Sequence, residues 1–234
     1  LFSSGKVQQH AIRLPEGMNL RVVASLLAEQ AVLEHRSTGW KHLQDELDLE
    51  LPFAEGAFFP DTYFVSAGAS DLSVLQRAHK AMLAQLRSAW NARANNLAVQ
   101  TPAQALILAS IIEKESDAPE DRRQSSQVFH LRLKKNMKLQ TDPTVIYALG
   151  EAFDGDIRRR DLRVDSPFNT YRYKGLPPTP IALPSRASIE AAVNPADGDY
   201  LYFVARGDGT SQFSRTLEEH NAAVRRYQLS RGGP

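Results

Sequence analysis

The chain has 234 residues, and its 28 Lys and Arg residues nearly balance its 27 Asp and Glu residues, for a formal net charge of +1. Hydrophobic residues make up 42% and charged residues 24%, which is ordinary globular usage and excludes wholesale disorder and fibrous classes. Because positive and negative charges are nearly equal in number, the composition gives no reason to expect a nucleic-acid partner. The absence of cysteine excludes disulfides, thiolate metal sites and cysteine nucleophiles.

The first fifty residues predict a small βα unit. Residues 9–14 favour a short strand that ends in a turn, and Asn19 favours the start of a helix just after it. We expect residues 1–50 to form a small subdomain and residues 51–234 to form the main domain. Residues 56–63 show neither helical nor strand periodicity, so they predict an aromatic loop.

The middle of the chain predicts a series of helices. Residues 71–90 carry apolar side chains at three- and four-residue steps, which is the pattern of a helix with one face on the core. Thr101 and the proline after it predict the start of the next helix, which we expect to run to about Ser116. Further helices are expected over residues 120–135 and 142–150.

The last third of the chain is rich in Pro, Gly, Tyr and Arg. It predicts a short helix over residues 188–193 and a strand over residues 200–204. The Asp-Gly pair at 208–209 favours a hairpin turn into a second strand, and Thr216 favours the start of a C-terminal helix. Together these elements predict an α+β fold with a helical core and a small β-containing part.

The helix that begins after Thr101 carries the most informative residue. On a helical wheel, Glu115 continues a stripe of leucine and isoleucine, whereas Glu113 points toward the polar, exposed side. A carboxyl group at the end of an apolar stripe is partly desolvated, and desolvation raises its pKa. A raised pKa suits a general acid near neutral pH. The same pattern also fits a helix-end residue that only reaches water past the core.

Other chemistries have no local signature. The six histidines lack the spacing of metal ligands, and the nucleophile-elbow, phosphate-loop and dinucleotide motifs are absent. We therefore expect neither a metal nor a cofactor. The Arg run at 158–160 is typical of a solvated face, although contact with an anionic polymer stays open. Asp142 either braces a helix N-terminus or acts as a partner of Glu115.

Five motifs occur in an order that resembles one family. The motifs are residues 109–116 (ASIIEKES), 139–147 (LQTDPTVIY), 169–171 (NTY), 175–178 (GLPP) and 200–204 (YLYFV). Together they closely resemble the MltG (YceG-like) family, the endolytic murein transglycosylases of bacteria. The resemblance covers nearly the whole chain.

The resemblance implies an enzyme that cuts the β-1,4 bond between N-acetylmuramic acid and N-acetylglucosamine within peptidoglycan strands. The product carries a 1,6-anhydro-muramyl end. It also implies that residues 1–50 are part of a LysM-like subdomain and that residues 51–234 are a YceG-like catalytic domain. Such proteins have a single inner-membrane anchor and an extracytoplasmic catalytic domain. Because the chain starts at Leu1, we expect that the anchor is missing from it. Limitation of glycan length, with peptidoglycan synthases as candidate partners, is implied as well.

The catalytic Glu of the family, the second in its Glu-Lys-Glu triplet, falls on Glu115. A transglycosylase needs no second carboxylate, because the C6 hydroxyl of the substrate attacks C1 and one residue moves the proton both ways. The candidate substrate-binding residues around it are Glu113, Gln140, Thr141, Asp142, Tyr147, Asn169, Thr170 and Tyr171. Two alternatives stay open: a muramidase-type hydrolase that uses Asp142 as its second carboxylate, and a non-catalytic peptidoglycan-binding module.

Overall fold

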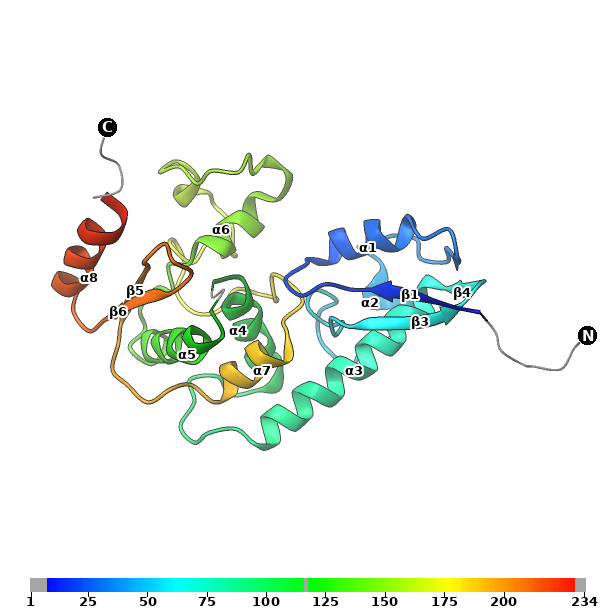
Figure 1. Cartoon of the computed structure of the whole chain (residues 1–234), viewed down its shortest axis with the longest axis horizontal. Coiled ribbons are helices and arrows are strands. Elements are labelled where there is room, and N and C mark those ends of the chain that lie inside the picture. The colour runs from blue at the N-terminus through cyan, green and yellow to red at the C-terminus, as the bar shows by residue number, and fades with distance from the viewer. Residues whose placement is uncertain (1–7, 116–117, 230–234) are drawn as a thin grey trace, which may run out of the picture.

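A computed structural model describes residues 8–115 and 118–229 of the chain. Its helices and small sheets confirm the predicted α+β class, with α4, α5 and α7 at the centre (Figure 1). The elements in chain order are β1 (Gln9–Arg13), α1 (Leu20–Ala28), β2 (Leu33–Glu34), α2 (Leu43–Glu46), β3 (Thr62–Ser66), β4 (Ala69–Ser70), α3 (Asp71–Asn91), α4 (Pro102–Glu115), α5 (Pro119–Lys134), α6 (Asp142–Leu149), α7 (Arg186–Val193), β5 (Tyr202–Ala205), β6 (Ser211–Ser214) and α8 (Leu217–Val224). Short 3₁₀ turns lie at Gly150–Ala152 and Asp161–Arg163, and a π-helix, Arg225–Leu229, follows α8.

The N-terminal region is built from short strands. β1 pairs antiparallel with β3, with Ile12 opposite Tyr63, and β2 pairs in parallel with β4. The expectation that residues 56–63 form only a loop is wrong, because β3 begins at Thr62 and alternates exposed and buried side chains to its end. The pairings cross residue 50, so a domain boundary there, and the LysM-like character of this region, stay predictions.

Helix α4 is hydrophobic on all sides. Every residue from 105 to 112 is buried, and α3, α5, α6 and α7 all contact the helix. The expectation of a single apolar stripe with an opposite polar side is therefore wrong, since a helix that is apolar all round lies inside the core. No helix among the described residues is long and apolar enough to cross a membrane.

The C-terminal region is a hairpin with a helix against it. β5 and β6 pair antiparallel, with Phe203 opposite Phe213, which confirms the predicted hairpin. The start of α8 is also confirmed: the Thr216 hydroxyl accepts from the backbone N–H of Glu219 at 3.2 Å, and both halves of a capping box are present.

Residues 181–185, which we call the strap, join the N-terminal region to α4. The backbone of Leu183 exchanges two hydrogen bonds with the first turn of the N-terminal region, accepting from Gly17 at 2.8 Å and donating to Met18 at 2.7 Å. Ile181 donates its N–H to the Ser110 hydroxyl of α4 at 3.0 Å. Gly17 has a φ of +73°, a conformation that favours glycine, and this turn places the two backbones side by side.

Candidate active site

Glu115 lies at the last described residue of α4, and the buried end of its side chain is unpaired. Its Oε2 atom is inaccessible to solvent and has no hydrogen-bond partner in the part of the chain that the structure describes. Burial is the main cause that raises the pKa of Glu115 from 4.5 to about 8, and the negative charge of Asp142 adds to it. The Thr141 hydroxyl and the Arg132 guanidinium act in the opposite direction. Glu115 is thus mostly protonated at neutral pH and can donate a proton.

Arg132 is a site residue that the sequence analysis missed. It is only 7% exposed, and it donates from Nε to the carbonyl of Leu201 and from Nη1 to that of Leu139, both at 2.7 Å. Its guanidinium lies 5.2 Å from the centre of the Tyr202 ring. The signal was available, because Arg132 follows buried apolar residues of α5 at three- and four-residue steps. A charged residue on such a face needs a partner or a function.

Asp142, Tyr171 and Thr141 gather around Glu115. The Tyr171 hydroxyl donates to Asp142 Oδ1 at 2.5 Å, and burial together with this bond raises the pKa of Tyr171, which therefore stays a donor. Asp142 occupies the first turn of α6, where the helix dipole favours a negative charge. Thr141 is 1% exposed and its hydroxyl has no geometrically good partner among the described residues. Gln140, its neighbour, is exposed.

Asn169 and Thr170 position other residues of the candidate site through hydrogen bonds. The side-chain amide of Asn169 donates to two carbonyls of the preceding loop at 3.1 and 2.8 Å, and its Oδ1 accepts from the N–H of Tyr171 at 3.0 Å. The Thr170 hydroxyl accepts from the N–H of Thr141 at 3.1 Å. Both side chains are buried and bonded to protein groups, so they position Thr141 and Tyr171. Direct contact of either with substrate stays a prediction.

Glu113 faces a different partner from Glu115. Its Oε2 accepts two hydrogen bonds from Ser185, one from the N–H at 2.9 Å and one from the hydroxyl at 2.5 Å. The expectation that Glu113 is exposed is therefore wrong, because it is half-buried and ties α4 to the residue that caps α7. Ser116, which the sequence motif pairs with Glu115, lies outside the described residues.

Tyr147 leads to a second buried acid. Its hydroxyl donates to Glu55 Oε2 at 3.0 Å, and Glu55 also accepts from the N–H of Leu20 at the start of α1 at 2.9 Å. Glu55 is 9% exposed, and burial raises its pKa to about 7. The sequence analysis missed Glu55, although a lone acid within the apolar run of residues 51–59 is the kind of residue that merits inspection.

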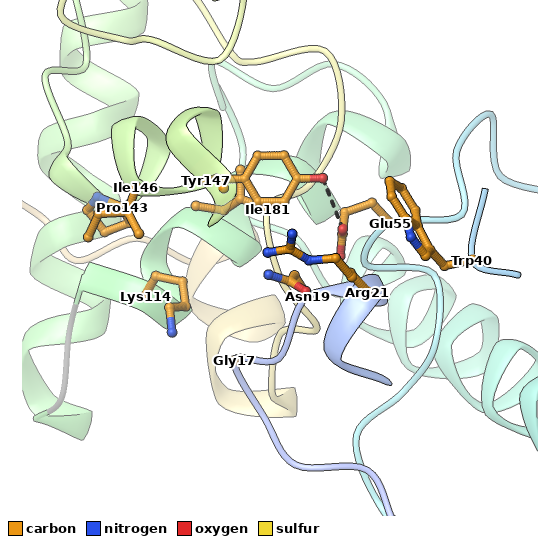
Figure 2. Close-up of a pocket in the computed structure, with 11 residues that line it drawn as sticks. Gly17, Asn19, Arg21, Trp40, Glu55, Lys114, Pro143, Ile146, Tyr147 and Ile181 are labelled. Atoms are coloured by element: carbon orange, nitrogen blue, oxygen red, sulfur yellow. Dashed lines mark hydrogen bonds between the residues drawn. The ribbon is translucent and has the colours of Figure 1, made fainter. Parts of the chain in front are cut away.

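A pocket of about 340 Å³ lies at the end of α4 that carries Glu115, and Figure 2 draws the residues that line it. Two of its lining residues, Lys114 and Pro143, are chain neighbours of Glu115 and Asp142. The pocket is bounded by the N-terminal region, the end of α4 and one side of α6, and its lining residues are Gly17, Asn19, Arg21, Trp40, Glu55, Lys114, Pro143, Ile146, Tyr147, Gly150 and Ile181. Within residues 8–115 and 118–229, no cluster of three or more histidine, aspartate or glutamate side chains is arranged to hold a metal ion.

Relatives of the chain are found by sequence. An endolytic murein transglycosylase of Bacillus subtilis (strain 168) is 42% identical over 182 residues, which cover 76% of this chain and 49% of that protein. A protein of the same name from Streptococcus pneumoniae serotype 2 (strain D39 / NCTC 7466) is 32% identical over 183 residues, which cover 76% of this chain and 33% of that protein. The chain thus spans about half the length of the first relative and a third of the second.

The fold and the family agree with these sequences. The crystal structure of a yceG-like protein from Listeria monocytogenes is similar with a TM-score of 0.74 and 34% sequence identity, covering 91% of this chain and 75% of that one. A model of the YceG-like family matches residues 1–226. The family resemblance drawn from the five sequence motifs is confirmed, and the chain belongs to the YceG-like family.

Proposed function

We propose that this chain carries the catalytic domain of an endolytic peptidoglycan transglycosylase. It cleaves the β-1,4 bond between N-acetylmuramic acid and N-acetylglucosamine within glycan strands and forms 1,6-anhydro-muramyl ends. The relatives from Bacillus and Streptococcus support this function by their names. The observation that carries the proposal is the buried oxygen of Glu115 that has no hydrogen-bond partner within residues 8–115 and 118–229, on a carboxyl group with a pKa of about 8.

The first step is proton donation. Protonated Glu115 gives its proton to the glycosidic oxygen, and the bond between C1 and that oxygen breaks. Positive charge then develops on the muramyl ring. The Asp142 carboxylate, held by the Tyr171 hydroxyl, supplies a fixed negative charge on this side of the site. The carboxylate left on Glu115 is stabilised by the Arg132 guanidinium and the Thr141 hydroxyl.

The second step returns the proton. The C6 hydroxyl of the same muramyl sugar attacks C1, and the Glu115 carboxylate accepts the hydroxyl proton as the new C–O bond forms. Glu115 ends the cycle protonated, and no water is consumed. One carboxyl group therefore serves as acid and then as base. Burial stabilises its protonated form, and the nearby Arg132 guanidinium stabilises its ionised form, so both forms are accessible.

Digestion of purified peptidoglycan sacculi tests the function. Mass spectrometry should find fragments with anhydro ends, which are lighter than reducing ends by the mass of one water molecule. Glu115→Gln should release almost nothing. Reducing ends that depend on Asp142 would instead identify a muramidase-type hydrolase, and strand binding without any release would identify a binding module.

The cellular setting belongs to the same proposal. We place the enzyme on the extracytoplasmic side of the bacterial inner membrane, where its substrate lies, with a LysM-like subdomain over residues 1–50 and the catalytic domain over residues 51–234. It limits the length of new glycan strands next to peptidoglycan synthases. Cells that lack the protein should therefore contain longer strands, and Glu115→Gln should not restore their length.

A further inference from the structure

The residues that line the pocket of Figure 2 take no part in the two proton-transfer steps, but the pocket adjoins the residues that do. Lys114 directly precedes Glu115, and Pro143 directly follows Asp142. Successive Cα atoms are about 3.8 Å apart, so the pocket wall begins one residue away from the acid. A substituent on a sugar held at Glu115 therefore falls within reach of this pocket.

Among the described residues that line the pocket, Lys114 carries a positive charge and has no ion-pair partner. No carboxylate or carbonyl among the described residues accepts a hydrogen bond from Lys114, whose side chain lies along the turn at Gly17. Arg21, by contrast, is paired with Glu151 at 2.5 Å. The Glu55 carboxyl accepts from Tyr147 and from the start of α1, and no salt bridge joins it to Lys114 among the described residues. The free ammonium favours an anionic ligand.

The pocket also has an apolar part beside its other polar residues, which are Asn19, Arg21, Glu55 and Tyr147. Pro143, Ile146 and Ile181 form one wall, and Trp40 on the opposite side is 39% exposed (Figure 2). A sugar ring can stack a C–H face on Trp40, but a neutral sugar has no anionic group for the Lys114 ammonium. A peptide that bears methyl groups and a carboxylate matches both features. In peptidoglycan, peptides with alanine residues and free carboxylates hang from the muramyl sugars.

We propose that this pocket binds the stem peptide of a muramyl sugar next to the cleaved bond, with Lys114 holding a peptide carboxylate and Trp40 packing on its apolar part. The inference rests on the proposed function and narrows its substrate to peptide-bearing glycan. Strands from which an amidase has removed the peptides lose the peptide carboxylates and methyl groups and keep only a lactyl carboxylate close to the sugar ring, so they bind more weakly.

Binding to an inactive enzyme tests the inference apart from the chemistry. In the double variant Glu115→Gln, Trp90→Phe, Trp40 is the one tryptophan left of two, and its fluorescence reports on the pocket. The protein is titrated with uncrosslinked strands that carry stem peptides and with the same strands stripped by an amidase. We expect peptide-bearing strands to bind about tenfold more tightly and to shift the Trp40 emission.

A matched pair of lysine variants identifies the contact. Lys114→Met, which keeps the aliphatic stem, should remove the tenfold preference by weakening only the peptide-bearing strands. Lys80→Met, on the exposed surface of α3 and outside the pocket, should leave it unchanged. Equal affinity for the two kinds of strand, or an equal loss for both in Lys114→Met, overturns the inference. The binding assay needs no turnover, so its result is independent of the reaction. If the wild-type enzyme forms no anhydro ends but the variant still prefers peptide-bearing strands, only the proposed function is overturned.

Discussion

Two glutamates on α4, two positions apart, have opposite environments. Glu113 accepts two hydrogen bonds from Ser185, whereas the Oε2 atom of Glu115 has no partner among the described residues. Two residues correspond to about 200° around a helix, so the two carboxyl groups leave α4 on different sides. Accepted hydrogen bonds stabilise an anion, and burial without them stabilises the neutral acid. The helix thus separates a structural acid, Glu113, from Glu115, which we propose as the reactive acid.

Replacement of the reactive acid should remove activity and leave the fold. Glu115→Gln should lower kcat by about 10²–10⁴-fold, the usual contribution of general acid–base catalysis. The melting temperature at pH 7 should rise rather than fall, because wild-type Glu115 must take up a proton when the chain folds at this pH and the neutral amide does not. Muropeptide release and calorimetry measure the two quantities, and a kcat near the wild-type value would exclude Glu115 as the acid.

Replacement of the structural acid should do the reverse. Glu113→Ala removes the acceptor of two hydrogen bonds from Ser185, which should lower the free energy of unfolding by about 1–3 kcal/mol. Denaturant titration checks this value. Glu190→Ala, on the exposed part of α7, is the control and should stay within about 0.5 kcal/mol. If both variants unfold alike, Glu113 does not tie α4 to α7.

The rate should depend on pH in a defined direction. Glu115 must be protonated to donate, so kcat/KM should fall as the pH rises through about 8. The negative charge of Asp142 raises the pKa of Glu115, so Asp142→Asn should move this alkaline limb to lower pH. A pH–rate profile of both proteins measures the shift. A limb that does not move would mean that Asp142 does not act on Glu115 through its charge.

At the level of helices and strands, local sequence signals are sufficient to predict where helices start and where the chain turns. Asn19 and Thr216 accept from the first turns of α1 and α8, and the hairpin after residue 204 pairs as its Asp-Gly turn predicts. Strand β3 escaped notice because its partner, β1, is distant in sequence. A sequence pattern contains propensities and caps, but not the partner that a strand finds after the chain has folded.

The candidate site shows the same division. Glu115 was singled out from a helical wheel whose polar side does not exist, because α4 is buried all round. The family resemblance pointed to the same residue on separate grounds. Arg132 and Glu55 were not predicted, because the role of Arg132 depends on its charge acting on Glu115 and that of Glu55 on a hydrogen bond from Tyr147, and both partners lie on other segments. Glu113 was expected in water because its acceptor role depends on the strap.

The loop before Tyr171 should depend on one amide. Asn169→Ala removes the donor to two loop carbonyls and the acceptor for the N–H of Tyr171. We expect a loss of about 1–3 kcal/mol in unfolding free energy and a lower kcat, since Tyr171 no longer holds Asp142 in place. Asn221→Ala on α8 is the exposed control. Full activity in Asn169→Ala would show that the loop does not position Tyr171.

For the whole molecule, two buried acids should give stability a pH slope. Folding raises the pKa of Glu115 from 4.5 to about 8 and that of Glu55 from 4.5 to about 7. Above pH 4.5 the unfolded chain loses these protons first, so the folded state binds more protons and stability falls as the pH rises toward 8. Below pH 4.5 the full stability of the neutral forms is present.

Substitution of one acid should flatten that slope. Glu55→Gln keeps an acceptor for Tyr147 and Leu20 but cannot ionise, so its unfolding free energy should fall less than that of the wild type between about pH 5 and pH 7. Denaturant titrations at several pH values measure the difference. Identical slopes in the two proteins would mean that Glu55 ionises in the folded chain as it does in water.

The backbone pairing of Leu183 with the turn at Gly17 has a consequence for the way this protein tolerates change. The strap that meets this turn also bonds to Ser110 and Glu113 of α4. One short segment is therefore hydrogen-bonded both to the N-terminal region and to α4. Truncation or replacement of the N-terminal region would remove hydrogen bonds that hold the strap, and the strap in turn bonds to α4. The N-terminal region and α4 are therefore expected to unfold as one cooperative unit.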